Sequence, residues 1–134
     1  MTHDEFIQIL PENQRQFATE LIEELSKIDG VKVYHTDADG GDLRVRIGEN
    51  GRVLFTMYWQ SRNEEYLCNC FVEKQYLETQ PAFFDARTIE TVGEPLFSSF
   101  RFKSNYFNTI SALTALVRET VKRFHFSCQI KDKK

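Results

Sequence analysis

The first thirty residues alternate apolar and polar positions with the period of an α-helix. A capping-box spacing in Thr2-His3-Asp4-Glu5 predicts a short helical turn over residues 2–9. A longer amphipathic helix is predicted from Pro11, which suits a first turn, to Asp29-Gly30, where glycine can adopt the left-handed cap conformation. The apolar residues of this helix are three or four positions apart: Phe17, Leu21, Ile22, Leu25 and Ile28.

The hydrophobic period then changes from about 3.6 to about 2, which is typical of β-strands. Gly48-Glu49-Asn50-Gly51 has the composition of a hairpin turn, because Asn and Gly accept positive φ. Residues 73–94 are predicted to be the least regular part, with Phe83-Phe84 in a loop anchored into the core. The predicted strands are Val31–His35, Leu43–Ile47, Val53–Trp59, Tyr66–Val72 and Leu96–Phe102.

A second helical stripe lies near the end of the chain. Ser104 or Asn105 can cap this helix, which is predicted over residues 104–126. The tail 127–134 is expected to add a short strand before it frays. The stripe consists of Tyr106, Ile110, Leu113, Val117, Val121 and Phe124.

Together these elements predict one α+β domain over residues 1–134. Since consecutive strands are joined by short turns and not by helices, the sheet should be an antiparallel meander of four to five strands. An N-terminal and a C-terminal amphipathic helix would pack on it. The predicted segments are 1–30 (helical), 31–103 (sheet), 104–126 (C-terminal helix) and 127–134 (basic tail).

Charge is distributed unevenly along the chain, although the formal net charge is only −3. Residues 1–30 carry seven acids and two bases, whereas residues 117–134 carry two acids and six bases. A net acidic chain lacks the surplus of cations that general binding to nucleic acid requires. The first residues show no signal-peptide pattern, and no apolar run approaches the roughly 20 residues that span a membrane. A cytoplasmic location without membrane attachment is therefore expected.

Three cysteines, Cys68, Cys70 and Cys128, form no disulfide framework. With His125 they could supply a thiolate metal site, but a C-x-C pair within a strand is a poor version of the zinc-knuckle pair, which has two to four intervening residues on a turn. Free cysteine is often buried, so a place in the core is favoured. No metal and no cofactor are predicted.

The densest polar cluster lies between His35 and Asp42. Counted from Asp37, it lacks the glycine and the glutamate that a calcium loop needs at its sixth and twelfth positions. It also lacks the Lys-Ser/Thr of a phosphate loop, so a tight acidic connection between strands is favoured. The alternative is a small enzyme or ligand-binding domain, which a deep pocket joining His35 to Asp37 and Asp39 would favour.

Arg44 and Arg46 share one strand face, and with Tyr58 and Trp59 they could form a stacking platform for single-stranded nucleic acid. Pairing of these arginines with acidic side chains is the favoured interpretation, so nucleic acid is not an expected partner. The chain has no nucleophile elbow, and its acid-x-Lys triplet lies in the C-terminal tail. No catalytic residue is predicted.

The sequence therefore favours a non-enzymatic protein-binding domain. In size and arrangement it resembles bacterial toxin-immunity proteins and secretion chaperones, which implies masking or inhibition of a partner such as a basic toxin or effector. A third interpretation is a homodimer whose interface is the strand face that carries Trp59. The predicted partner-binding residues form an acidic and an aromatic group: Glu20, Glu23, Glu24, Asp37, Asp39, Asp42, Tyr58, Trp59 and Tyr66.

Overall fold

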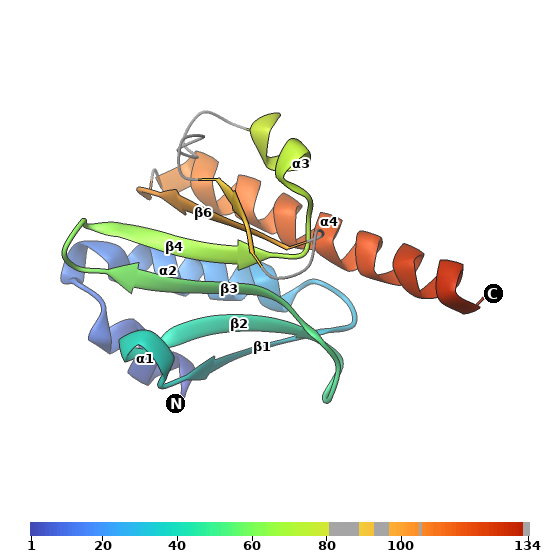
Figure 1. The fold of residues 1–134 in the computed structure, drawn as a ribbon. Helices are drawn as coiled ribbons and strands as arrows, with labels where there is room; N and C mark the ends of the chain where they lie inside the picture. The colour runs from blue at the N-terminus through green and yellow to red at the C-terminus, as the bar shows by residue number, and fades with distance from the viewer. Residues whose placement is uncertain (81–88, 93–96, 105, 133–134) are drawn as a thin grey trace.

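The computed structural model describes residues 1–80, 89–92, 97–104 and 106–132. They form an α+β fold with one layer of helices and one sheet (Figure 1). The described helices are α1 (His3–Ile9), α2 (Glu12–Ser26), α3 (Lys74–Glu78) and α4 (Tyr106–Asp132). The described strands are β1 (Val31–Thr36), β2 (Asp42–Ile47), β3 (Val53–Gln60), β4 (Glu65–Cys70), β5 (Glu90–Thr91) and β6 (Ser98–Phe102).

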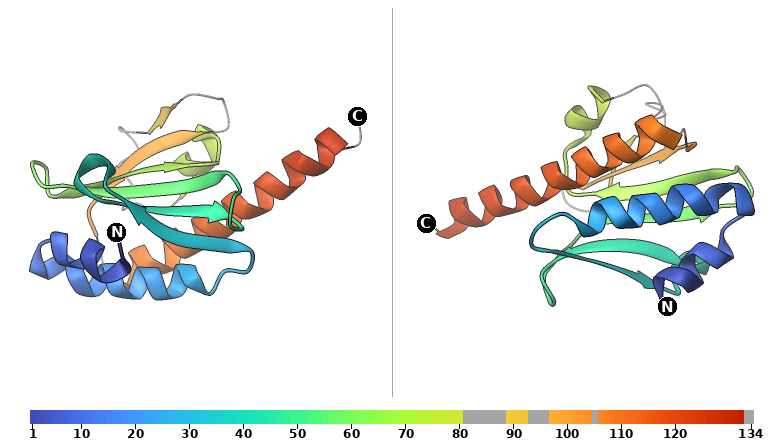
Figure 2. Two further views of the ribbon diagram at one scale, coloured as in Figure 1. Left: turned by 90° about the horizontal axis from the view of Figure 1, so that it is seen from below. Right: turned by 180° about the vertical axis from the view of Figure 1, so that it is seen from behind.

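In the described part of the chain, six antiparallel strands form one sheet in the order β1-β2-β3-β4-β6-β5. The predicted α+β class and antiparallel sheet are confirmed, with six strands instead of four to five. The first four strands form the predicted meander. Strand β6 then returns beside β4, and the two-residue β5 pairs outside it. Helices α1, α2 and α4 lie on one face of the sheet, and no described helix covers the opposite face (Figure 2).

The N-terminal helices begin and end close to the predicted positions. The Oγ1 of Thr2 accepts a hydrogen bond from the backbone N–H of Glu5, and the Glu5 carboxylate accepts one from the Thr2 N–H, both at 3.1 Å. This reciprocal pair is the predicted capping box. Pro11 takes the N-cap position of α2, one residue before the helix. Helix α2 ends at Ser26 with Lys27 at its C-cap, so the predicted glycine cap is wrong, and Gly30, with a φ of +81°, belongs to the turn before β1.

Two predictions for irregular segments differ from the structure. The region 73–94 contains the short helix α3 and the strand β5. The short strand predicted for the tail is wrong, because α4 continues as a helix to Asp132. Residues 124–132 contain neither Gly nor Pro, so nothing in this segment interrupts the helical hydrogen bonds. Phe83, Phe84, Leu96 and Asn105 lie outside the described residues.

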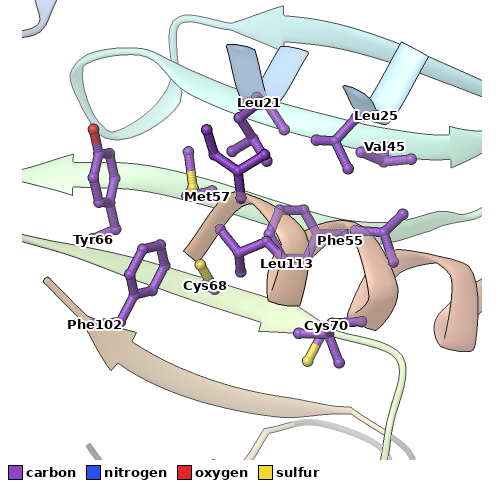
Figure 3. Close-up of a cluster of buried hydrophobic side chains, with 14 of the residues drawn as sticks. Leu21, Leu25, Val45, Phe55, Met57, Tyr66, Cys68, Cys70, Phe102 and Leu113 are labelled. Carbon is purple, nitrogen blue, oxygen red and sulfur yellow. The ribbon is translucent and has the colours of Figure 1, made fainter. Parts of the chain in front are cut away.

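The hydrophobic core lies between the sheet and the helices (Figure 3). Strand register places the core-facing residues in rows across the sheet, such as Leu43, Met57, Cys68 and Phe100. Leu21, Leu25 and Leu113 contribute to this core from α2 and α4. Among the described helices, none combines the length and the apolar character that crossing a membrane requires.

Candidate partner-binding site

Three predicted acidic residues lie together on the outer side of α2. Glu20, Glu23 and Glu24 share one helix face because they are three and four positions apart. The opposite side of α2 is buried against the core, which leaves these carboxylates pointing away from it. A groove of about 570 Å³ runs between α2 and α4, and we call it the acidic groove. Its lining residues are Glu20, Glu23, Glu24, Ile110, Ser111, Thr114, Ala115 and Arg118.

The acidic groove carries a surplus of negative charge. Glu24 pairs with Lys27 at 2.8 Å, and both side chains of this pair are well exposed. Glu20 and Glu23 form no ion pair with any residue in the described ranges, and Arg118 is the one cation among the lining residues. An exposed surface ion pair contributes little to stability, so Glu24 can exchange Lys27 for a ligand at small cost. All three carboxylates are therefore available to a ligand.

The sequence analysis missed the α4 side of this groove. Ser111, Ala115 and Arg118 are exposed and flank the apolar stripe that packs Leu113 and Val117 into the core. Their spacing of three and four residues was a readable signal for one helix face. The tertiary packing of α4 beside α2 brings this face to the groove. The sequence pattern contains no information on that packing.

The aromatic part of the predicted site does not form one surface. Successive side chains of a strand alternate between the two faces of a sheet, so Tyr58 and Trp59 point in opposite directions. Trp59 pairs with Tyr66 across β3 and β4, on the helix-covered face, with ring centroids 4.9 Å apart. Tyr66 is completely buried, and Trp59 packs against the core. The prediction of a shared surface at these three residues is wrong, and the Trp59 face offers no open aromatic interface for a homodimer.

Tyr58, Asp39 and Asp42 belong to the uncovered face of the sheet, far from the acidic groove. They border a shallow depression of about 440 Å³ together with residues of β2, β3 and β4. Asp37 is exposed in the connection between β1 and β2. The structure therefore divides the predicted acidic residues between two surfaces, one on each side of the molecule.

The uncovered face holds a polar network centred on the Asp42 carboxylate. Its Oδ1 accepts hydrogen bonds from the backbone N–H and the hydroxyl of Thr36, at 3.0 and 2.9 Å. Its Oδ2 accepts one from the Nε of Arg44 at 2.9 Å, and this bond raises the pKa of Arg44. The guanidinium of Arg46 lies 4.6 Å from the ring centroid of Tyr34. Arg44 thus pairs with an acidic side chain, as expected. Arg46 contacts the Tyr34 ring instead of an acid, and its Nε is buried without a hydrogen-bond partner among the described residues.

His35 lies on the helix-covered face, away from this network. Its Nδ1–H donates to the backbone carbonyl of Asp42 at 3.1 Å, which leaves Nε2 to accept from the Nδ1–H of His3 at 2.6 Å. Burial lowers the pKa of His35. Since Asp37 and Asp39 follow β1 in an exposed connection, these residues do not converge with His35 on a pocket.

Cys68 and Cys70 are buried in the core, and burial raises the pKa of both thiols. Cys128 and His125 lie on the C-terminal part of α4. Within the residues that the structure describes, no group of three or more His, Cys, Asp or Glu side chains is placed to hold a metal ion.

Comparison with known proteins does not assign this chain to a family. No protein-family model matches the chain, and neither a curated protein nor a solved structure matches it.

Proposed function

We propose that this chain is a non-enzymatic protein-binding domain whose acidic groove receives a basic segment of another protein. The observation that carries the proposal is the position of Glu20, Glu23 and Glu24, which together line one side of the groove. Carboxylates gathered on one surface attract a basic partner and steer its approach.

The chemistry of the other wall fits a protein segment better than a small metabolite. Ile110 and Ala115 supply apolar surface, and Ser111 is small enough to let a partner helix approach closely. Small-molecule sites usually enclose a ligand with a few convergent polar groups, whereas here the three carboxylates line one wall of an open groove. Such a row fits the basic face of an amphipathic helix.

The partner class that we propose is a basic toxin or effector. A row of three carboxylates can occupy positions that phosphates take on a nucleic-acid-binding surface, and so block that surface. The chain would then act as an immunity-type inhibitor or as a chaperone that masks its partner. No bond is made or broken in this mode of action.

A capture experiment with matched variants tests the proposal. The tagged wild-type chain and the variant Glu20→Gln/Glu23→Gln/Glu24→Gln are used to capture proteins from the native host cells. The control Glu12→Gln/Glu64→Gln/Glu78→Gln removes three exposed carboxylates that lie outside the groove.

We expect the wild type and the control to retain the same basic protein, which mass spectrometry identifies. The groove variant should bind it at least about tenfold more weakly, and added salt should weaken the wild-type complex. Equal capture by all three proteins, or a captured partner without a basic surface, would contradict the proposal.

A further inference from the structure

Two imidazole rings meet where the start of α1 packs against β1 (Figure 1). The Nδ1 of His3 lies 2.6 Å from the Nε2 of His35, although the two residues are 32 positions apart in the chain. Hydrogen bonds from N–H groups in proteins usually span about 2.7–3.2 Å, so this contact is short. Two nitrogen atoms that can each offer a lone pair thus converge from two different elements of the fold.

The ring of His35 is held in the orientation that a metal ligand needs. Its Nδ1–H donates to the backbone carbonyl of Asp42 at 3.1 Å, which leaves the lone pair on Nε2, facing His3. Phe6 stacks on the same ring, with centroids 4.5 Å apart. Histidines that bind metal ions usually donate their other ring N–H to a carbonyl or a carboxylate in this way. Burial lowers the pKa of His35, and the neutral imidazole is the form that binds a metal ion.

The side chain of His3 is exposed and can adjust to a cation. A neutral imidazole can carry its proton on either nitrogen, so His3 can hold it on Nε2 and offer the lone pair of Nδ1. Bonds of about 2.0–2.1 Å from both nitrogens to one Zn²⁺ ion require an N···N distance of about 2.9–3.4 Å. The two rings therefore need to separate by less than about 1 Å. The exposed side of His3 leaves the other coordination positions to water.

We propose that His3 and His35 bind one divalent cation of the class that prefers imidazole nitrogen, such as Zn²⁺, and that this cation fastens α1 to β1. On binding, the Nδ1 proton of His3 leaves to solvent and Nε2 takes up another, so both rings stay neutral. Among the described residues, no third His, Cys, Asp or Glu side chain completes the site. Two protein ligands with water give a moderate affinity. The site lies apart from the acidic groove, so the inference does not depend on the proposed function.

Calorimetric titration of the untagged chain with Zn²⁺ at about pH 7.5, in a buffer that does not bind metal ions, tests the proposal. We expect one equivalent of Zn²⁺ to bind with a dissociation constant below roughly 100 µM. His3→Gln and His35→Gln should each weaken binding at least about tenfold. Because His3 is exposed, circular dichroism should show that His3→Gln keeps the fold.

Two controls separate this site from others on the chain. His125 and Cys128 lie three positions apart on α4, and His125→Gln/Cys128→Ser should bind Zn²⁺ as the wild type does. Mg²⁺ prefers oxygen ligands, so it should not bind to the histidine pair at about 1 mM. Hydrogen exchange then locates the effect: Zn²⁺ should slow the exchange of α1 amides in the wild type but not in His3→Gln.

Absence of Zn²⁺ binding to the wild type would overturn the proposal and leave the two rings with a hydrogen bond only. Binding that His3→Gln leaves intact would overturn it too, because the cation would then lie elsewhere. Loss of binding in His125→Gln/Cys128→Ser would assign the cation to α4 and have the same consequence. Equal binding of Mg²⁺ and Zn²⁺ would point to carboxylates instead of imidazoles and would also overturn it.

Discussion

The Nε of Arg44 donates a 2.9 Å hydrogen bond to Oδ2 of Asp42, although these residues are only two positions apart on the same strand. Both side chains point to the uncovered face of the sheet, and Asp42 is only 2% exposed. The other carboxylate oxygen is occupied by Thr36, so Asp42 joins β1 to β2 at the start of their hairpin. A residue that the sequence suggested as a binding residue thus has a structural role here.

Replacing Asp42 by Asn should destabilise the protein by about 1–3 kcal/mol, because a charge-assisted hydrogen bond is lost and a buried acceptor becomes a donor near Thr36. Urea unfolding at neutral pH measures this difference. The control Asp37→Asn changes an exposed carboxylate of the same connection, and its effect should stay within about 0.5 kcal/mol. Equal effects of the two substitutions would contradict the structural role of Asp42.

The buried imidazole of His35 should make stability depend on pH below the ordinary histidine pKa of about 6.5. Its pKa is lower in the folded protein than the ordinary value of 6.5 because the side chain is buried. The unfolded chain therefore binds a proton more readily than the folded chain. Stability should be complete above about pH 6.5 and should fall as the pH drops from there towards the folded-state pKa.

Urea midpoints measured at about pH 7.5 and about pH 5 test this dependence. His35→Gln should lower the urea midpoint at about pH 7.5, and the further decrease of the midpoint between about pH 7.5 and about pH 5 should be smaller than in the wild type. The exposed His125→Gln is the matched control and should retain the wild-type pH dependence. Glu5, Glu49 and Glu73 have lowered pKa values, and their contribution to the pH dependence is the same in wild type and variants, so it cancels in the comparison. An unchanged pH dependence in His35→Gln would contradict this prediction.

The elements with a clear hydrophobic period could be predicted from the sequence. Helix α2 buries one regular set of side chains, and the alternation of β3 places Phe55 and Met57 in the core, so the hydrophobic period determined the local conformation. The alternation within β3 places Trp59 and Tyr58 on opposite faces. The predicted aromatic group joined Tyr58 to Trp59 and Tyr66, although the helices cover the face of the sheet that carries Trp59 and Tyr66.

Short elements and contacts between distant segments could not be predicted. Strand β5 has two residues, which are too few to show a period, and it exists because β6 offers a free edge. The acidic side of the groove followed from helical spacing of Glu20, Glu23 and Glu24. Its other wall depends on α4, whose position beside α2 is set by packing of residues about ninety positions apart.

The three thiols should differ sharply in reactivity. Cys68 and Cys70 are fully buried and their pKa values are raised, whereas Cys128 is half-buried on α4. With an aromatic disulfide reagent, the native protein should show one fast thiol, and the other two should react at least about a hundredfold more slowly. Three fast thiols should appear in denaturant. Cys128→Ser should abolish the fast native phase, and persistence of that phase would contradict the assignment.

The hydroxyl of Tyr66 donates a 2.9 Å hydrogen bond to Oε1 of Gln14 inside the core, which links β4 to α2. The same oxygen accepts from the hydroxyl of Ser104 at 2.8 Å. Tyr66→Phe keeps the buried ring and removes one of the two donors, so unfolding free energy should fall by about 0.5–1.5 kcal/mol.

The matched control for this substitution is Tyr58→Phe on the uncovered face. The hydroxyl of Tyr58 accepts a long hydrogen bond of 3.4 Å from Nε2 of Gln60, and the Tyr58 side chain is half-buried. Its effect should be below about 0.5 kcal/mol. A double-mutant cycle between Tyr66→Phe and Gln14→Leu should give a coupling energy near 1 kcal/mol. Additive effects of these two substitutions would show that the hydrogen bond does not stabilise the packing of α2 on the sheet.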